Sequence, residues 1–523
     1  METRPLQWLS KLQKSISDTT PRPGLHPIPN SQPLTVTAAV LPPFIYYLAL
    51  LLLAPPPPPA VNKPLVKLLR NCLALVAGIL FFRLPLDYHV PQSIGLTYQL
   101  GLVGLYGGCR VLDAFFISPY LLGHIPRRVK YHHSPRNESP DSMGNRDNKE
   151  WTDGGVADPF HHDGSSQEGS SDDAVDGGVH TQKSSRADAT QKPARIRTAS
   201  QAVGSAIRRS ISGPSPMAVT ETAETEGGWP NSLLDRAAWA LELELSMRGI
   251  GFTWTTADVR HTRRTWLPTI HNRIHSILVH VCPVLFVGWA VIRTVYARYL
   301  LPMEDAPWEA FSAYDLFDHC IPMPLQLLLT AALGAFLMAA FSFGHSLFAI
   351  MLNPLAPSPL AFFPPLYTTR AWQITSVRKF WSFGWHRLFA RLFLVYGIWP
   401  GEFVERKLLG KSLDQPADVG KVIGAFLSSG FVHSFSVRGV LAGDWRMATG
   451  EAKFFALNGI AVVLEGVIIR IVSRIRKKDG TPRQMWYDAI IGRIWWINVL
   501  LWTGRNFARG WVKSGLVREM AFL

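Results

Sequence analysis

The sequence predicts an all-α, multi-pass membrane protein with about seven to nine transmembrane helices and one polar insert. Charged residues make up 17% of the 523 residues, well below the roughly 25% of an ordinary soluble domain, and hydrophobic residues make up 47%. Several apolar runs approach the ~20 residues that a helix needs to cross a bilayer. Residues 132–227, in contrast, contain no leucine and carry 10 Lys and Arg against 15 Asp and Glu. This pattern excludes a collagen-like chain, a coiled coil, a disulfide scaffold and a single soluble globule.

Nine segments are candidates for membrane crossings. In chain order they are residues 35–54, 71–82, 96–121, 274–295, 324–352, 388–399, 422–440, 454–472 and 490–502. The shortest runs fall below the length of a full span, so they are expected to be partial, tilted or re-entrant. Arg110 and Asp113 interrupt the third segment near its end. Basic clusters beside the spans, such as Arg127, Arg128 and Lys130, predict cytosolic loops by the positive-inside rule.

The chain divides by composition into five parts. Residues 1–34 form a polar, Pro-rich leader, and residues 35–131 hold the N-terminal helices; because the first span begins so late, a cleaved signal peptide is not expected. Residues 132–227 are predicted to be a disordered cytosolic loop, since their hydrophobic content is too low to offset chain entropy. A second helical domain covers 228–510, and a C-terminal tail covers 511–523.

Several classes of function leave no signature in the chain. The four cysteines match no CxxC spacing, and the pair His161–His162 falls in the polar loop, so we expect no metal and no bound cofactor. There is no GxSxG elbow, no Walker loop, no GxGxxG, and no His followed four or five positions later by Asp. The net charge of +15 comes from the flanks of the spans, and no basic groove interleaved with aromatics accompanies it. Nucleic acid is therefore not an expected partner.

Histidines at membrane depth are the first candidates for chemistry, because polar side chains are costly there. His433 follows the small residues Ser429 and Gly430 in an otherwise apolar run, and such residues allow close approach of a backbone or a substrate. A neutral imidazole, whose pKa is about 6.5, can take a proton from an alcohol. A histidine that only bonds a neighbouring helix fits these residues equally well.

A second candidate is His386, which ends an aromatic cluster. Trp381 and Trp385 are one helical turn apart, with Arg378 and His386 nearby. An aromatic belt at the membrane interface is the alternative interpretation, and composition alone favours it. Other histidines carry less weight: His271 and His275 lack the Glu of a zinc-protease motif and His345 fits a packed histidine.

Taken in order, these stretches resemble the wax synthase branch of the membrane-bound O-acyltransferases, and more narrowly the fungal acetyltransferases that act on terpenoids and meroterpenoids. The resemblance covers residues 233–502. Its pieces are Arg248-Gly249-Ile250-Gly251-Phe252, Pro364-Pro365-Leu366-Tyr367, the block Ser376, Arg378, Phe380, Trp381, Trp385 and His386, then Ser429-Gly430-Phe431-Val432-His433, and finally Phe454-Phe455, Asn458-Gly459 and Glu465. Phe252 stands where Trp is usual, and Ser434 where a Glu often follows the histidine.

The resemblance implies an MBOAT-like membrane enzyme, with residues 228–510 as its acyltransferase domain, that transfers an acetyl group from acetyl-CoA to a hydroxyl of a hydrophobic terpenoid in secondary metabolism. His433 would be the general base and His386 the oxyanion donor or orienting group. Trp381, Trp385, Ser429 and Gly430 would bind substrate, and Arg378, with Arg370 as a weaker choice, would pair with CoA phosphates. The expected location is the endoplasmic reticulum membrane.

Three other functions stay open at this stage. A long-chain acyl-CoA with a fatty alcohol would make the protein a wax synthase, and the length of the substrate tunnel would decide between the two donors. A multi-pass transporter would need charged residues within the spans and usually an internal repeat. The predicted spans contain few carboxylates, with Glu465 as the exception, and no repeat is visible. A non-catalytic membrane scaffold would leave both histidine blocks unexplained. The oligomeric state is not determined by the sequence.

Overall fold

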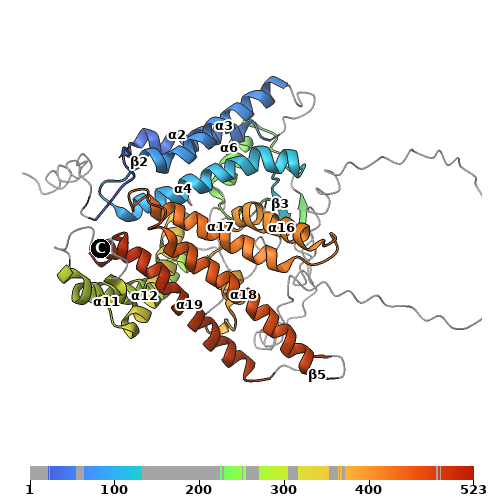
Figure 1. Cartoon of the computed structure of the whole chain (residues 1–523). Coiled ribbons are helices and arrows are strands. Elements are labelled where there is room, and N and C mark those ends of the chain that lie inside the picture. Colours follow the sequence, from blue (N-terminus) through green and yellow to red (C-terminus); the bar gives the residue numbers. More distant parts are fainter. Residues whose placement is uncertain are drawn as a thin grey trace, which may run out of the picture. The chain divides into compact units, whose positions relative to one another are not determined.

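The computed structural model describes residues 22, 24–54, 64–131, 224–226, 229–249, 251–254, 270–303, 316–352, 363, 366–367, 371–478, 481–482 and 485–522. These residues are mostly helical, which confirms the predicted fold class (Figure 1). Most of the predicted disordered loop, including His161–His162, lies outside the described residues, as do Arg370 and most of the leader.

The helices and strands have the following bounds. The N-terminal part contains β1 (Gln32–Pro33), α2 (Val36–Leu51), α3 (Pro64–Asp87), β2 (Tyr88–His89), α4 (Ile94–Leu112), the π-helical η1 (Asp113–Leu121) and β3 (Val129–Tyr131). After the loop come β4 (Glu224–Glu226), α6 (Leu233–Leu245), α8 (Ile270–Ser276), η5 (Ile277–Val281), α9 (Cys282–Val295), η6 (Tyr296–Leu300), η7 (Leu301–Met303), α11 (Leu316–Cys320) and α12 (Met323–Leu352). The C-terminal part contains η8 (Ala371–Gln373), α14 (Val377–Lys379), η9 (Phe380–Gly384), α15 (Ala390–Phe393), η10 (Leu394–Ile398), α16 (Trp399–Leu409), α17 (Asp418–Arg438), α18 (Thr449–Ile475), β5 (Lys477–Lys478), β6 (Thr481–Pro482), α19 (Asp488–Lys513) and α20 (Leu516–Ala521).

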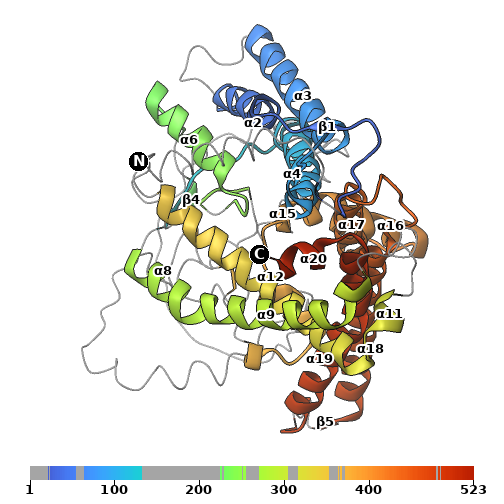
Figure 2. The same ribbon diagram turned by 90° about the vertical axis from the view of Figure 1, so that its left-hand side faces the viewer.

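The long helices pack in a continuous series, each against the next. The order is α2, α3, α4, α17, α18, α19, α12 and α9, and the short α20 contacts α4, α9 and α19 (Figures 1 and 2). The small strands pair only locally: β1 with β2, β3 with β4, and β5 with β6. The contact between α4 and α17 therefore joins parts of the chain that are more than 300 residues apart.

Five helical segments among the described residues are long and apolar enough to cross a membrane: Pro64–Asp87, Ile94–Leu121, Ile270–Leu300, Met323–Leu352 and Thr449–Ile475. The run 71–82, predicted to be a partial span, is the middle of α3, which continues through charged residues on both sides. The run 388–399, another of the short candidates, is divided among α15, η10 and the start of α16. Large apolar side chains face outward, among them Phe286 and Val287 on α9, as expected of helices whose surroundings are lipid.

The charged residues inside the predicted third span are paired and buried. The Arg391 guanidinium on α15 donates to both oxygens of Asp113, at 2.7 and 2.9 Å, and Ser118 donates to the same carboxylate at 2.7 Å. Arg110 donates to the Tyr106 hydroxyl at 2.6 Å and to carbonyl groups at the end of α6. Both guanidinium groups lie over the ring of the buried Trp254. These contacts fasten the N-terminal helices to the second domain.

Glycines set the crossing of α17 with the segment formed by η10 and α16. A Cβ atom on Gly424 would lie 2.1 Å from the Gly397 carbonyl oxygen, and one on Gly401 would lie 2.1 Å from the Gly420 carbonyl oxygen. Each helical segment thus presents two glycines four residues apart at the crossing, a spacing that brings helix backbones into contact.

Both ends of the chain contribute to the core. Residues of the predicted leader contact the C-terminal domain, since the Ala442 amide donates to the His26 carbonyl at 2.7 Å and Leu25 is buried in the main core. Residues after 510, for which the sequence suggested only a tail, include the buried Trp511 and the helix α20. Glu519 of α20 accepts from the Ser93 hydroxyl and the Gly95 amide at the start of α4.

We predict that Gly424→Ala destabilises the protein, because the added methyl group forces α17 and η10 apart at a cost of about 1–3 kcal/mol. The measurement is the midpoint of thermal unfolding in detergent. Gly466→Ala on α18 is the matched control, since nothing lies within 4 Å of its Cβ position. Equal midpoints for the two variants would contradict the glycine crossing.

We also predict that Asp113→Asn destabilises the protein by about 3–5 kcal/mol, because Arg391 then stays buried without its anion. The same change in the exposed pair of Arg83 and Asp87, whose side chains are 66% and 37% exposed, serves as control. Asp87→Asn should cost less than about 1 kcal/mol. A stable Asp113→Asn protein would show that the pair does not hold these helices together.

Candidate functional site

His433 lies where four helices meet. Its helix, α17, packs between α4 and α18, and α19 packs on α18. The Nδ1 atom of His433 is 2.8 Å from the Tyr98 hydroxyl of α4. Its ring stacks on Phe455 of α18, with centroids 4.8 Å apart, and meets Phe507 of α19 edge-on at 6.0 Å. The histidine is therefore fixed by one hydrogen bond and two aromatic rings, while Nε2 makes no hydrogen bond to a described residue.

A buried carboxyl group lies beside this histidine. Glu451, in the first turn of α18, has no exposed surface. Its Oε1 atom accepts from the indole N–H of Trp511 at 2.7 Å, and its Oε2 atom has no hydrogen-bond partner among the described residues. Trp511 also packs edge-on against the Tyr98 ring at 5.7 Å.

The segment that carries the second histidine is held by side chains of α18. Glu465 accepts from the backbone N–H groups of Val377 and Arg378, at 2.8 and 3.4 Å, at the start of α14. Asn458 accepts from the indole N–H of Trp381 at 3.1 Å and donates to Thr503 of α19 at 2.9 Å. Because these groups supply hydrogen bonds that a short helix lacks, α18 imposes the shape of this segment.

The aromatic cluster packs within the helices rather than forming an outward belt. Trp381 contacts Phe426, Phe454 and Phe455 of α17 and α18. Trp385 ends η9 with an extended backbone conformation. It therefore does not lie on one helix with Trp381, as their spacing of one helical turn had suggested. Its ring nevertheless lies 6.0 Å from that of Trp381.

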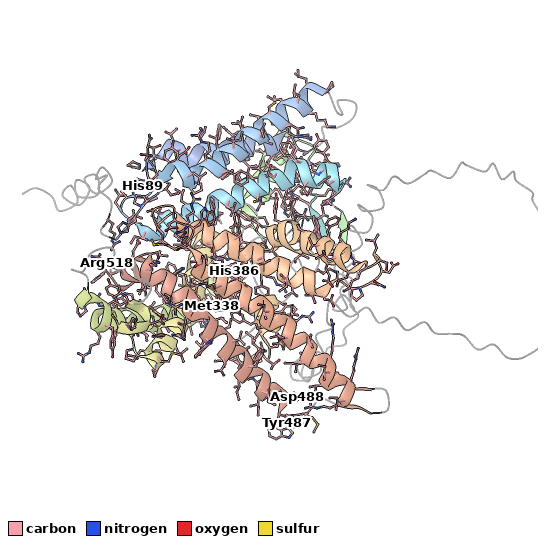
Figure 3. All side chains as sticks on the ribbon, in the orientation of Figure 1. His89, Met338, His386, Tyr487, Asp488 and Arg518 are labelled. Carbon is pink, nitrogen blue, oxygen red and sulfur yellow. The ribbon has the colours of Figure 1, made fainter. Side chains whose placement is uncertain are left out.

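His386 follows directly and lies near the centre of the ribbon in Figure 3. Its ring contacts Phe341, Trp385 and Phe389, at centroid distances of 5.1, 5.0 and 5.9 Å. The Nδ1 atom is buried and has no hydrogen-bond partner among the described residues. A continuous series of ring contacts leads from His386 to His433, through Trp385, Trp381 and Phe455, so the structure links the two predicted histidines across 47 residues of sequence.

The Arg248–Phe252 element has buried side chains at both of its ends, Arg248 and Phe252. Gly249 and Gly251 adopt positive φ angles of 70° and 85°, which favour glycine. Arg248 is 5% exposed. Burial lowers the pKa of Arg248, and the nearby charges of Arg273 and Arg387 lower it further.

The other predicted site residues have varied positions. Ser429 is buried in α17, and Gly430 faces α18, where a Cβ atom would lie 3.2 Å from the Cα of Ala452; its lack of a side chain thus serves helix packing. Arg378 is half-buried at the start of α14. His345 lies on α12 with its ring 5.4 Å from Phe363, and His271 is exposed on α8.

Sequence reasoning missed Tyr98, Glu451 and Trp511. Tyr98 and Trp511 lie outside the stretch that resembles the acyltransferases, and Glu451 lies just before the Phe454-Phe455 element. A carboxyl residue at the start of an otherwise apolar helix was the one available signal, because such a group is costly unless it has a partner.

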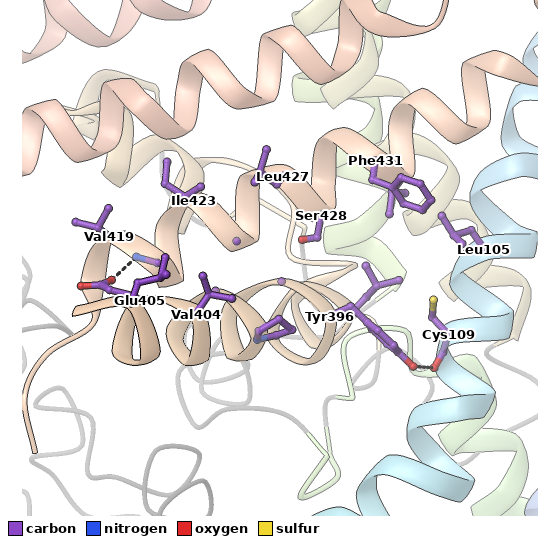
Figure 4. Close-up of a pocket in the computed structure, with 18 of the residues that line it drawn as sticks. Leu105, Cys109, Tyr396, Val404, Glu405, Val419, Ile423, Leu427, Ser428 and Phe431 are labelled. Atoms are coloured by element: carbon purple, nitrogen blue, oxygen red, sulfur yellow. Dashed lines mark hydrogen bonds between the residues drawn. The ribbon is translucent and has the colours of Figure 1, made fainter. Parts of the chain in front are cut away.

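An apolar cavity of about 740 Å³ lies on another face of α17 (Figure 4). It is lined mainly by η10, α16 and α17, with Leu105 and Cys109 of α4 and Leu392 of α15. Glu405 marks one end, where it accepts from the Gly420 amide and pairs with Lys411. His433 does not line it, although its neighbour Val432 does. In the described part of the chain, no cluster of three or more His, Cys, Asp or Glu could hold a metal ion.

Comparison with known proteins identifies the class. Residues 363–457, which include both histidines, match the membrane bound O-acyl transferase family. The chain is 26% identical over 293 residues to acetyltransferase eriL of Hericium erinaceus, covering 53% of this chain and 69% of that protein. It is 24% identical to acetyltransferase ple2 of Rhodocybe pseudopiperita, covering 53% and 67%. It is 23% identical to O-mevalon transferase yanI of Aspergillus niger, covering 50% and 60%.

No solved structure matches the chain. The matched segment, the relatives and the apolar helices agree with the resemblance seen in the sequence. The chain is therefore a membrane protein and an acyltransferase, similar over residues 363–457 to the membrane bound O-acyl transferase family.

Proposed function

We propose that the protein transfers an acetyl group from acetyl-CoA to a hydroxyl of a hydrophobic terpenoid or meroterpenoid, in the endoplasmic reticulum membrane and within fungal secondary metabolism. The observation that carries this proposal is the series of ring contacts that joins His386 to His433, together with the buried Nδ1 atom of His386, which has no partner among the described residues. Buried polar atoms without a protein partner are rare, and a substrate is one common reason for them. Two of the relatives are named acetyltransferases, which favours acetyl as the group transferred.

In this reaction His433 accepts the proton of the acceptor hydroxyl at Nε2, because its Nδ1 is engaged by Tyr98. The alcohol oxygen attacks the thioester carbonyl, and the His386 ring N–H stabilises the negative oxygen that forms. Trp381 and Trp385 supply apolar walls for the acceptor. Arg378, which comes just before the aromatic cluster in the chain, pairs with phosphates of CoA. No resident cofactor or metal is part of this scheme.

The donor is tested by giving membranes that contain the protein labelled acetyl-CoA or palmitoyl-CoA, with a panel of hydroxylated terpenoids and fatty alcohols. We expect label in a terpenoid ester from acetyl-CoA. Ester formed only from palmitoyl-CoA would instead make the protein a wax synthase. That result would also point to the apolar cavity beside α17 as a candidate for holding a long acyl chain.

We predict that His433→Ala lowers kcat by about 10²–10⁴-fold, because the general base is lost. The matched control is His271→Ala, which removes an exposed imidazole from α8 and should leave turnover unchanged. Immunoblots of the membranes verify equal amounts of protein. Turnover retained by His433→Ala would refute the assignment of the base.

We predict that His386→Asn keeps part of the activity, whereas His386→Leu loses about 10²–10³-fold in kcat, because only an amide can replace the ring N–H as a donor. The measurement is kcat for both variants at saturating acetyl-CoA. If His386→Asn were as inactive as His386→Leu, His386 would have a role in proton transfer instead.

A further inference from the structure

Two buried polar atoms lie around the ring of Trp385, and neither has a hydrogen-bond partner among the described residues. They are the Tyr367 hydroxyl and the Nδ1 atom of His386. The ring centroid of Trp385 is 6.2 Å from that of Tyr367 and 5.0 Å from that of His386. Trp381, whose ring also contacts Trp385, has its indole N–H bonded to Asn458. The proposed mechanism uses a ring N–H of His386 but leaves the Tyr367 hydroxyl without a role.

Tyr367 is held in place by apolar packing, and its hydroxyl contributes no described contact to the fold. The preceding residue, Leu366, is buried in the main core, and the Tyr367 ring packs against the same core. A hydroxyl that is buried without a partner lowers stability, and a phenylalanine would fill the same space without that cost. The cost disappears when a bound ligand supplies the missing partner. Burial also raises the pKa of Tyr367, so the phenol keeps its proton at neutral pH and is able to donate.

The position of Tyr367 favours the acceptor as that ligand. In the proposed function Trp385 is an apolar wall for the acceptor, and the Tyr367 ring contacts this wall. The oxygen of the thioester is already served by His386. A terpenoid carries few groups that form hydrogen bonds, so an oxygen at a fixed place on its skeleton is a feature that a single hydroxyl can recognise.

We propose that the Tyr367 hydroxyl binds a second oxygen of the acceptor, one that is not acetylated, and thereby makes the enzyme selective for terpenoids that are oxygenated at two positions. This inference rests on the proposed function. Tyr367 donates to a carbonyl or hydroxyl oxygen that the reaction leaves unchanged, and no bond to Tyr367 forms or breaks. Such a site discriminates against the analogue that lacks the oxygen, because its own polar group is then left unpaired.

The first test measures kcat/KM of the full-length protein with labelled acetyl-CoA and two kinds of acceptor. One is a diterpene mono-alcohol, and the others are diols of the same skeleton that differ in the place of the second hydroxyl. We expect wild type to prefer one diol over the mono-alcohol by about 10- to 100-fold. In Tyr367→Phe the value for that diol should fall toward the value for the mono-alcohol. NMR of the products verifies that the same hydroxyl is acetylated in each case.

The matched control is Tyr47→Phe, which removes a hydroxyl from another half-buried tyrosine. The Tyr47 hydroxyl donates to the Ala237 carbonyl at 3.2 Å, between α2 and α6. Tyr47→Phe should therefore keep the wild-type preference for the diol.

A second test needs no turnover and follows the thermal unfolding of the full-length protein in detergent. Without acceptor, we expect Tyr367→Phe to unfold at the wild-type midpoint or above it, because the variant removes a buried hydroxyl without a partner. A lower midpoint would show that the hydroxyl serves the fold, and the inference would be wrong. The preferred diol should raise the wild-type midpoint more than the mono-alcohol does, and this difference should be lost in Tyr367→Phe.

The outcomes separate this inference from the function on which it rests. If wild type acetylates the mono-alcohol and every diol equally well, or if Tyr367→Phe keeps the preference, the inference is wrong and the proposed function stands. An equal loss of kcat with all acceptors would place the Tyr367 hydroxyl on the acetyl donor and would also overturn the inference. If wild type acetylates none of the acceptors, the proposed function fails, and the thermal comparison still decides whether Tyr367 distinguishes the diol from the mono-alcohol.

Discussion

The buried ion pair between Asp113 and Arg391 is the constraint on which the candidate site depends. Asp113 begins the continuation of α4, the helix that carries Tyr98, and Arg391 follows His386 by five residues. Both charges are out of water, so each is tolerable only while the other stays in bonding position. This requirement fixes α4 against the segment of His386. The pairing also explains why Asp113 is present near the end of an apolar span, although the hydropathy pattern alone would mark a charged residue there as a break in the span.

Helix α18 provides the second fixed reference. Its Glu465, Asn458, Phe455 and Glu451 follow one another toward its N-terminus, and they contact in turn the start of α14, Trp381, His433 and Trp511. One helix therefore positions both histidine segments. The segment of His386 forms only short helical pieces of its own, so its conformation is set by these contacts and not by local propensity.

The sequence was sufficient for what depends on local pattern. Apolar runs located the long helices, and the resemblance selected His386 and His433, because the histidines and their aromatic neighbours are contiguous. It was insufficient where residues meet through tertiary structure. Tyr98 is 335 residues from His433 in the chain, and its α4 neighbours indicate only an apolar helix. Trp511 fell in a presumed tail because the apolar run 490–502 ends before the helix does.

The two faces of α17 connect helix packing with the proposed chemistry. One face holds Gly420 and Gly424 against Gly401 and Gly397, so closely that no side chain fits between the backbones. The other directs His433 toward Tyr98 and Phe455. Close-packed protein interiors have low compressibility and transmit strain, so a displacement at one face of α17 is felt at the other. A change that pushes α17 away from η10 would thus move His433 relative to Tyr98, and an offset of about 1 Å is enough to weaken catalysis. The glycines at this crossing therefore help to position His433, although none of them lies in the candidate site.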